Sequence, residues 1–177
     1  GFHHRDSLGN DSVVMAGGVQ RFTAGKGIVH SELPGTRGLN RGLQLWVRLS
    51  SRLRGMKPDY QQVEPSAIPE KVSKGSRIRT VVGEGSPVEL HTKVVYLDVT
   101  LLPRSEFAYD VGSELSVMMY VLEGGLTLGR SKLGRGEAGL LTTGERVEAA
   151  ADGETRFVLI GGKPHGEPIV LRGSFVY

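Results

Sequence analysis

The feature that most constrains the fold is a two-residue alternation of apolar and polar side chains, which recurs in short runs along the chain. The clearest run is "GLQLWVRL" at 42–49, where every second residue is aliphatic. The run "RIRTVV" at 77–82 follows a similar alternation. Because successive side chains of a β-strand point to opposite faces, both runs predict half-buried strands.

Other short runs carry the same signal and are separated by glycine, of which the chain has 26. They predict strands at Ser12 to Met15, Val19 to Thr23, Val94 to Leu102, Leu115 to Leu122, Arg156 to Ile160 and Ile169 to Leu171. Many short strands at such spacing are typical of an all-β sandwich or barrel. Between 51 and 75 the alternation stops in a charged stretch with three prolines. We therefore expect a β module at 1–50, a linker at 51–75 and a second β module at 76–177.

Composition excludes several classes of protein. No apolar run approaches the roughly 20 residues that a membrane helix needs, so we expect no membrane span. The chain has no cysteine, which excludes disulfides, thiolate metal sites and cysteine nucleophiles. Its 22 basic and 19 acidic residues are interleaved, without the basic stripe that binds a phosphate backbone, so direct nucleic-acid binding is not expected. The compartment stays open, with an intracellular one favoured.

The two modules are similar to each other when the chain is compared with itself. The alignment places Thr23-Ala24-Gly25 over Thr142-Thr143-Gly144, Gly17 over Gly136, Phe22 over Leu141 and Ile28 over Val147. A similar distance on, "GLQLWVRL" has a counterpart in "TRFVLIGG" at 155–162. In this register His30 falls over Ala149 and Glu32 over Ala151. The same place is therefore polar and able to hold a metal in the first module, and inert in the second.

His30 and Glu32 follow "GKG" at 25–27, whose glycines allow the backbone to turn into a strand. Residues two apart on a strand share a face at about 6 to 7 Å, so an imidazole and a carboxylate can converge on one ion. Such a pair suits iron(II), manganese, nickel or zinc. The alternative is a solvent-facing polar pair, and the spacing alone does not separate the two interpretations.

Five stretches carry a more specific signal: "HRDSLGN" at 4–10, "VQRFTAGKGIVHSE" at 19–32, "GLQLWVRL" at 42–49, "YLDVTLLP" at 96–103 and "LIGGKPHGEPIVLRGSFV" at 159–176. In order and spacing they resemble the pirin family of bicupins. The resemblance implies two cupin (jelly-roll) barrels. The N-terminal barrel of the family holds iron, or a related divalent metal, through three histidines and one glutamate. His30 and Glu32 correspond to the last two ligands, and the first two belong to a His-Pro-His-Arg-Gly segment that is not in this sequence. The resemblance thus implies an incomplete N-terminal barrel.

The resemblance leaves two classes of function open. One is an oxidoreductase of the quercetin 2,3-dioxygenase type, which uses Fe(II) or another divalent metal on a flavonoid-like small molecule. The other is a non-enzymatic regulatory or structural subunit with a degenerate metal site and a protein partner, which could be a second copy of the chain. Two protein ligands hold an ion loosely, so a metal-free chain is an open alternative. No residue is assigned a catalytic role.

The remaining histidines are weaker candidates. His3 and His4 are adjacent, so on a strand they face opposite sides and cannot both serve one site. His4 is a minor candidate to replace a missing ligand. His91 and His165 are isolated in sequence, and we expect each to be structural or exposed.

Overall fold

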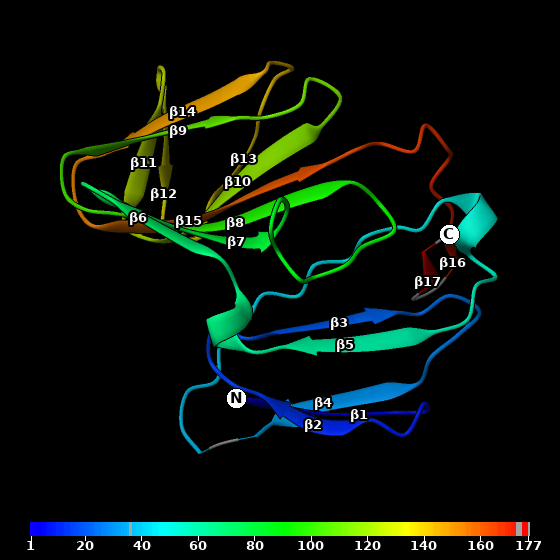
Figure 1. The fold of residues 1–177 in the computed structure, drawn as a ribbon. Helices are drawn as coiled ribbons and strands as arrows, with labels where there is room; N and C mark the ends of the chain where they lie inside the picture. Colours follow the sequence, from blue (N-terminus) through cyan, green and yellow to red (C-terminus); the bar gives the residue numbers. More distant parts are fainter. Residues whose placement is uncertain (36, 173–174, 177) are drawn as a thin grey trace. The chain divides into compact units, whose positions relative to one another are not determined.

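The computed structural model describes residues 1–35, 37–172 and 175–176 (Figure 1). Strands dominate it, which confirms the all-β class predicted from the alternation. Its contacts group the chain into two compact units, Pro69–Pro164 and a unit made of Gly1–Ile68 with His165–Tyr177. No helix in the described part of the chain is long and apolar enough to cross a membrane.

The unit at Pro69–Pro164 consists of two antiparallel sheets. The six-stranded sheet has the order β13-β10-β15-β8-β7-β6, and the four-stranded sheet has the order β12-β11-β14-β9. The strands are β6 (Glu70–Ser73), β7 (Ser76–Val82), β8 (Val94–Leu101), β9 (Ser105–Asp110), β10 (Ser116–Glu123), β11 (Gly125–Leu128), β12 (Ser131–Gly134), β13 (Ala138–Leu140), β14 (Arg146–Ala151) and β15 (Thr155–Gly162).

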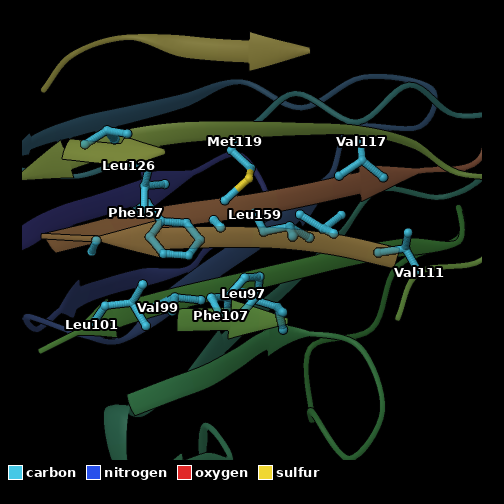
Figure 2. Packing of buried hydrophobic residues seen from close by; sticks show 14 of the residues in the cluster. Leu97, Val99, Leu101, Phe107, Val111, Val117, Met119, Leu126, Phe157 and Leu159 are labelled. Atoms are coloured by element: carbon cyan, nitrogen blue, oxygen red, sulfur yellow. The ribbon is translucent and has the colours of Figure 1, made fainter. Parts of the chain in front are cut away.

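One hydrophobic core fills this unit (Figure 2). On β8 the alternation buries Leu97, Val99 and Leu101 completely. Phe157 of β15 meets Phe107 of β9 edge to face, with ring centroids 5.2 Å apart, so the core joins both sheets. Complete burial of such a side chain contributes roughly 1.5–3 kcal/mol. The unit therefore has the sandwich of sheets expected of a cupin.

The other unit has fewer strands and smaller sheets. They are β1 (Phe2–Asp6), β2 (Asp11–Val14), β3 (Val19–Thr23), β4 (His30–Pro34), β5 (Asp59–Val63), β16 (Leu171–Arg172) and β17 (Phe175–Val176). Among the described residues they form the sheets β2-β1-β4, β3-β5 and β16-β17. Two short 3₁₀ turns, η1 (Ser51–Leu53) and η2 (Pro65–Ala67), flank β5. The described part of this unit agrees with the incomplete N-terminal barrel that the resemblance implied.

The strand predicted at 42–49 is not formed, so that prediction was wrong. In the described part of the chain, residues 41–47 make no backbone hydrogen bond, and Leu43 and Trp46 are 47% and 69% exposed. A strand needs a neighbouring strand to satisfy its backbone N–H and C=O groups, and the structure describes no such neighbour for this segment among residues 1–35, 37–172 and 175–176. The run predicted at 169–171 also differs, because β16 begins only at Leu171.

The stretch at 51–75 contains paired strands. β5 pairs with β3, and β6 pairs with β7. The compact units meet at Ile68 and Pro69, and the chain returns to the first unit at His165. There Glu167 accepts hydrogen bonds from Arg48 and Ser51. The division into a first module at 1–50, a linker at 51–75 and a second module at 76–177 stays a prediction.

Candidate metal site

The backbone before β4 turns sharply at the two glycines of "GKG". Gly25 has a φ of 52°, and a Cβ atom there would lie 2.3 Å from the Met56 carbonyl oxygen. That same oxygen accepts a hydrogen bond from the Lys26 N–H at 2.9 Å. Gly27 has a φ of 135°, which L-residues rarely adopt. The glycines thus allow the close approach that directs the chain into β4.

Strand β4 pairs with β1 in a register that sets four ionisable side chains in two rows. His4 lies opposite Glu32, and Asp6 lies opposite His30. Directly opposed residues of an antiparallel pair share a face, so all four project to the same side. The side chains of His4 and Asp6 are completely buried, whereas His30 and Glu32, on the edge strand, are exposed. An accessible imidazole and carboxylate therefore lie beside a buried pair of the same kind.

The buried pair is held by a short network. His4 Nε2 lies 3.0 Å from Asp6 Oδ2, and Asp6 also accepts hydrogen bonds from Asn10 Nδ2 and the Leu8 N–H. Burial raises the pKa of the Asp6 carboxyl, but the hydrogen bonds from His4 and Asn10 outweigh this and hold that pKa well below its usual range. The ionised carboxylate can only accept, so Nε2 of His4 carries a proton. Within the described residues the other ring nitrogen, Nδ1, has no partner.

Aromatic rings from the β3-β5 sheet pack against His4 and His30. The His4 ring stacks on Tyr60 of β5 with centroids 4.7 Å apart and lies 5.8 Å from the His30 ring. Phe22 of β3 lies 4.4 Å from His30. The rings of His4 and Phe22 therefore restrict the orientation of the exposed His30 imidazole.

The Glu32 carboxylate is oriented differently. Gln44 Nε2 donates a hydrogen bond to Glu32 Oε2 at 3.1 Å. Gln44 belongs to the segment 42–49, which forms no strand. This hydrogen bond therefore joins β4 to a segment whose backbone pairs with no strand among the described residues.

The donor types at His30 and Glu32 fit a divalent metal, because one imidazole nitrogen and one carboxylate oxygen suit such ions. Across residues 1–35, 37–172 and 175–176 there is no group of three or more histidine, aspartate or glutamate side chains arranged to hold an ion. His30 and Glu32 thus match part of a coordination shell. Their assignment as ligands stays a prediction.

The other histidines lie away from this pair. His3 Nε2 contacts Asp11 Oδ1 at 2.5 Å and is partly exposed, in contrast to the buried His4. His165 Nε2 donates to the Arg48 carbonyl oxygen at 2.9 Å, and His91 is exposed. A structural or exposed position was expected for both.

Sequence reasoning missed three groups that shape the site: Asp6, Tyr60 and Gln44. Asp6 lies two residues after His4, so the two-residue repeat of a strand would have predicted that both side chains lie on one face. Tyr60 lies in the stretch interpreted as a linker, and Gln44 lies in the segment interpreted as a strand. Neither carries a local signal, because both reach the site through tertiary contacts.

In the second unit the aligned positions lack these groups. Ala149 and Ala151 of β14 are 6% and 3% exposed and belong to the apolar core or border it. β14 pairs with β11, the first strand of the β11–β12 hairpin, as β4 pairs with β1 of the β1–β2 hairpin. Corresponding strands therefore carry a polar pair in one unit and alanines in the other.

Comparisons with known proteins agree on one family. Residues 1–47 match the family model described as "Pirin", and residues 96–177 match "Pirin C-terminal cupin domain". A pirin-like protein of Arabidopsis thaliana, At1g50590, is 39% identical over 98% of this chain and 62% of its own length. The putative pirin-like protein At3g59260 of the same plant is 33% identical over 99% of this chain and 69% of its own length. The chain thus spans less than two thirds of the first of these relatives.

Solved structures of two bacterial proteins have a similar fold. Quercetin 2,3-dioxygenase from Acinetobacter baumannii superposes with a TM-score of 0.89 at 26% identity, covering 99% of this chain and 65% of that one. The bacterial pirin YhhW from Escherichia coli, solved in complex with nickel(II), has a TM-score of 0.66 at 21% identity, covering 92% of this chain and 68% of that one. The second likeness concerns the fold alone.

Proposed function

Because the chain belongs to the pirin family of cupin proteins, we propose that it is the metal-binding part of an oxidoreductase of the quercetin 2,3-dioxygenase type. The observation that carries the proposal is the His30–Glu32 pair on the exposed edge strand β4, next to a buried histidine and aspartate. The likeness to the Acinetobacter enzyme supports the substrate class, a flavonol.

In this proposal His30 supplies a nitrogen donor and Glu32 an oxygen donor to Fe(II) or another divalent ion. When bound, such an ion provides Lewis acidity and open coordination positions for substrate and oxygen. The protein's part is to hold the donors in place. Phe22 and His4 restrict the imidazole, and Gln44 restricts the carboxylate.

The test combines elemental analysis with a flavonol-dependent oxygen-uptake assay. Because two protein donors leave most of the coordination shell to water, we expect the chain of 177 residues to purify with well under one equivalent of metal and without turnover. A form extended at its N-terminus by a His-x-His segment should bind about one equivalent. His30→Ala should abolish this binding and leave the second unit folded. Metal content unaffected by His30→Ala would overturn the proposal.

A second candidate function is that of a non-enzymatic interaction subunit, and the exposed segment 42–49 favours it. The alternation of "GLQLWVRL" suits a strand. Among the described residues the backbone of 42–47 pairs with no strand, and the side chains of Leu43 and Trp46 are exposed. We propose a second copy of the chain as the partner. Sedimentation over a range of micromolar concentrations should then show a dimer, and Trp46→Arg should shift it to monomer. A well-folded monomer throughout would rule this candidate out.

A further inference from the structure

The two candidate metal ligands are not equally supported by their surroundings. Both project from β4, an edge strand whose five residues are all exposed, so the strand itself does not fix their rotamers. His30 packs against two rings, those of Phe22 and His4. For Glu32, the hydrogen bond from Gln44 is the one contact of its carboxylate that the described residues show. The orientation of Glu32 thus depends on Gln44.

Gln44 is well placed for this task because its segment is anchored on both sides. On one side Asn40 Oδ1 accepts a hydrogen bond from the backbone nitrogen of Gly1 at 3.0 Å. On the other side Arg48 donates to both the carbonyl and the carboxylate oxygen of Glu167, at 3.0 and 2.9 Å. Within the described residues, the segment between these anchors pairs with no strand, and the amide of Gln44 donates its hydrogen bond to β4.

The hydrogen bond from Gln44 to Glu32 is of the kind that orients a metal ligand without contacting the metal itself. A carboxylate that binds a metal is commonly hydrogen-bonded by a neighbouring group, which fixes its orientation, and loss of that group weakens metal binding. The Gln44 amide donates through Nε2 to Oε2, which leaves Oε1 of Glu32 without that hydrogen bond. Glutamine is neutral and does not oppose the approach of a cation.

We propose that Gln44 is a positioning residue for the metal site, acting through the Glu32 carboxylate. The inference rests on the proposed function, because it assumes that Glu32 is a ligand. It adds a residue from outside β4 and gives the segment 42–49 a role in the site.

The test measures Ni²⁺ binding to the whole chain by line broadening of the β4 amides during titration. Gln44→Leu removes the donor at similar size, and we expect it to raise the dissociation constant about ten- to hundredfold. Leu45→Ala, next to Gln44 and without a polar side-chain group to donate to Glu32, is the matched control. It should leave the constant within about twofold of wild type.

A double-mutant cycle separates positioning through Glu32 from a merely structural tie. Glu32→Gln removes the proposed ligand, so Gln44→Leu should weaken Ni²⁺ binding little further in that background if Gln44 acts through Glu32. If Gln44 only ties the segment down, Gln44→Leu should weaken binding by the same factor with and without Glu32, which would overturn the proposal. We expect no further loss in the double variant, with an unchanged melting temperature.

The remaining outcomes also decide the matter. If His30→Ala abolishes Ni²⁺ binding and Gln44→Leu does not change it, the positioning role is wrong and the proposed metal site stands. If neither variant changes binding, or wild type binds no Ni²⁺, the proposed function fails and the positioning role fails with it.

Discussion

The segment 42–49 and strand β15 have related patterns but different structures. "TRFVLIGG" forms β15, a central strand that pairs with β10 on one side and β8 on the other, and it buries Phe157, Val158 and Leu159. "GLQLWVRL" is equally aliphatic, yet it forms no strand and exposes Leu43 and Trp46. The difference lies in the neighbours, because the described part of the first unit has no counterpart of β10 or β8 beside the segment.

This comparison shows that a two-residue alternation predicts which side chains would share a face of a strand, but not whether the strand forms. The strand forms only where a second backbone satisfies its hydrogen-bonding groups and a second layer covers its apolar side chains. Both conditions hold for β15. Neither holds at 42–49, where the side-chain contact to Glu32 and the two anchors hold the chain instead.

The sharpest test of this difference is a matched pair of truncations. Leu159→Ala leaves a cavity in a completely buried position and should lower the free energy of unfolding by about 2–5 kcal/mol. Leu45→Ala, at a position 38% exposed, should change it by less than about 0.5 kcal/mol. Chemical denaturation of both variants measures the two values. Equal losses in the free energy of unfolding would mean that 42–49 is packed like β15.

A smaller effect is expected at the aligned glycines before β4 and β14. Gly25→Ala places a Cβ 2.3 Å from the Met56 carbonyl oxygen at a φ of 52°, which should destabilise the first unit by about 1–3 kcal/mol. Gly144 has no atom within 4 Å of an added Cβ, so Gly144→Ala should cost less than about 0.5 kcal/mol. Thermal unfolding of the two variants compares them. A larger loss at Gly144 would contradict the comparison of the two turns.

The smallest effect concerns the anchor at Glu167. Hydrogen bonds from the N–H and hydroxyl of Ser51 lower the pKa of Glu167 below its ordinary value of 4.5, and Arg48 adds to this. A lowered pKa means that the contact stabilises the fold above about pH 4.5 and that this contribution is lost as the pH falls. Hydrogen exchange at the Ser51 amide, corrected for its intrinsic rate, should lose protection by about threefold on acidification.

The control for this prediction is Glu167→Gln, which has no carboxyl to titrate. Its Ser51 amide should be less protected at neutral pH and should show no loss of protection on acidification. If wild type and Glu167→Gln respond to acid alike, Glu167 does not hold the segment.

Much of the fold was predictable because its signals are local. The runs at 12–15, 19–23, 77–82 and 94–102 become β2, β3, β7 and β8 within a residue or so of the predicted bounds. The alternation predicted a strand wrongly at 42–49, because it depends on the side chains of the segment and not on the presence of a neighbouring strand. It missed β5 because the prolines and charges around Asp59–Val63 hide a strand whose partner, β3, lies far back in the chain.

The candidate site was predictable in part for the same reason. His30 and Glu32 were found because they are two residues apart on one strand. The buried partners His4 and Asp6 depend on the register between β1 and β4, which no local pattern gives. Gln44 lies twelve positions after Glu32 and outside β4, so only the structure shows their contact.

The central claim is that the first unit holds a metal at His30 and Glu32, whereas the aligned alanines of β14 hold none. Paramagnetic broadening by Mn²⁺ tests it most directly, because amide resonances near the ion lose intensity even when binding is weak. In the whole chain the broadening should centre on His30 to Glu32 and the facing residues of β1, spare β14, and vanish in His30→Ala. Broadening that centres on the second unit, or that persists in His30→Ala, would contradict the account.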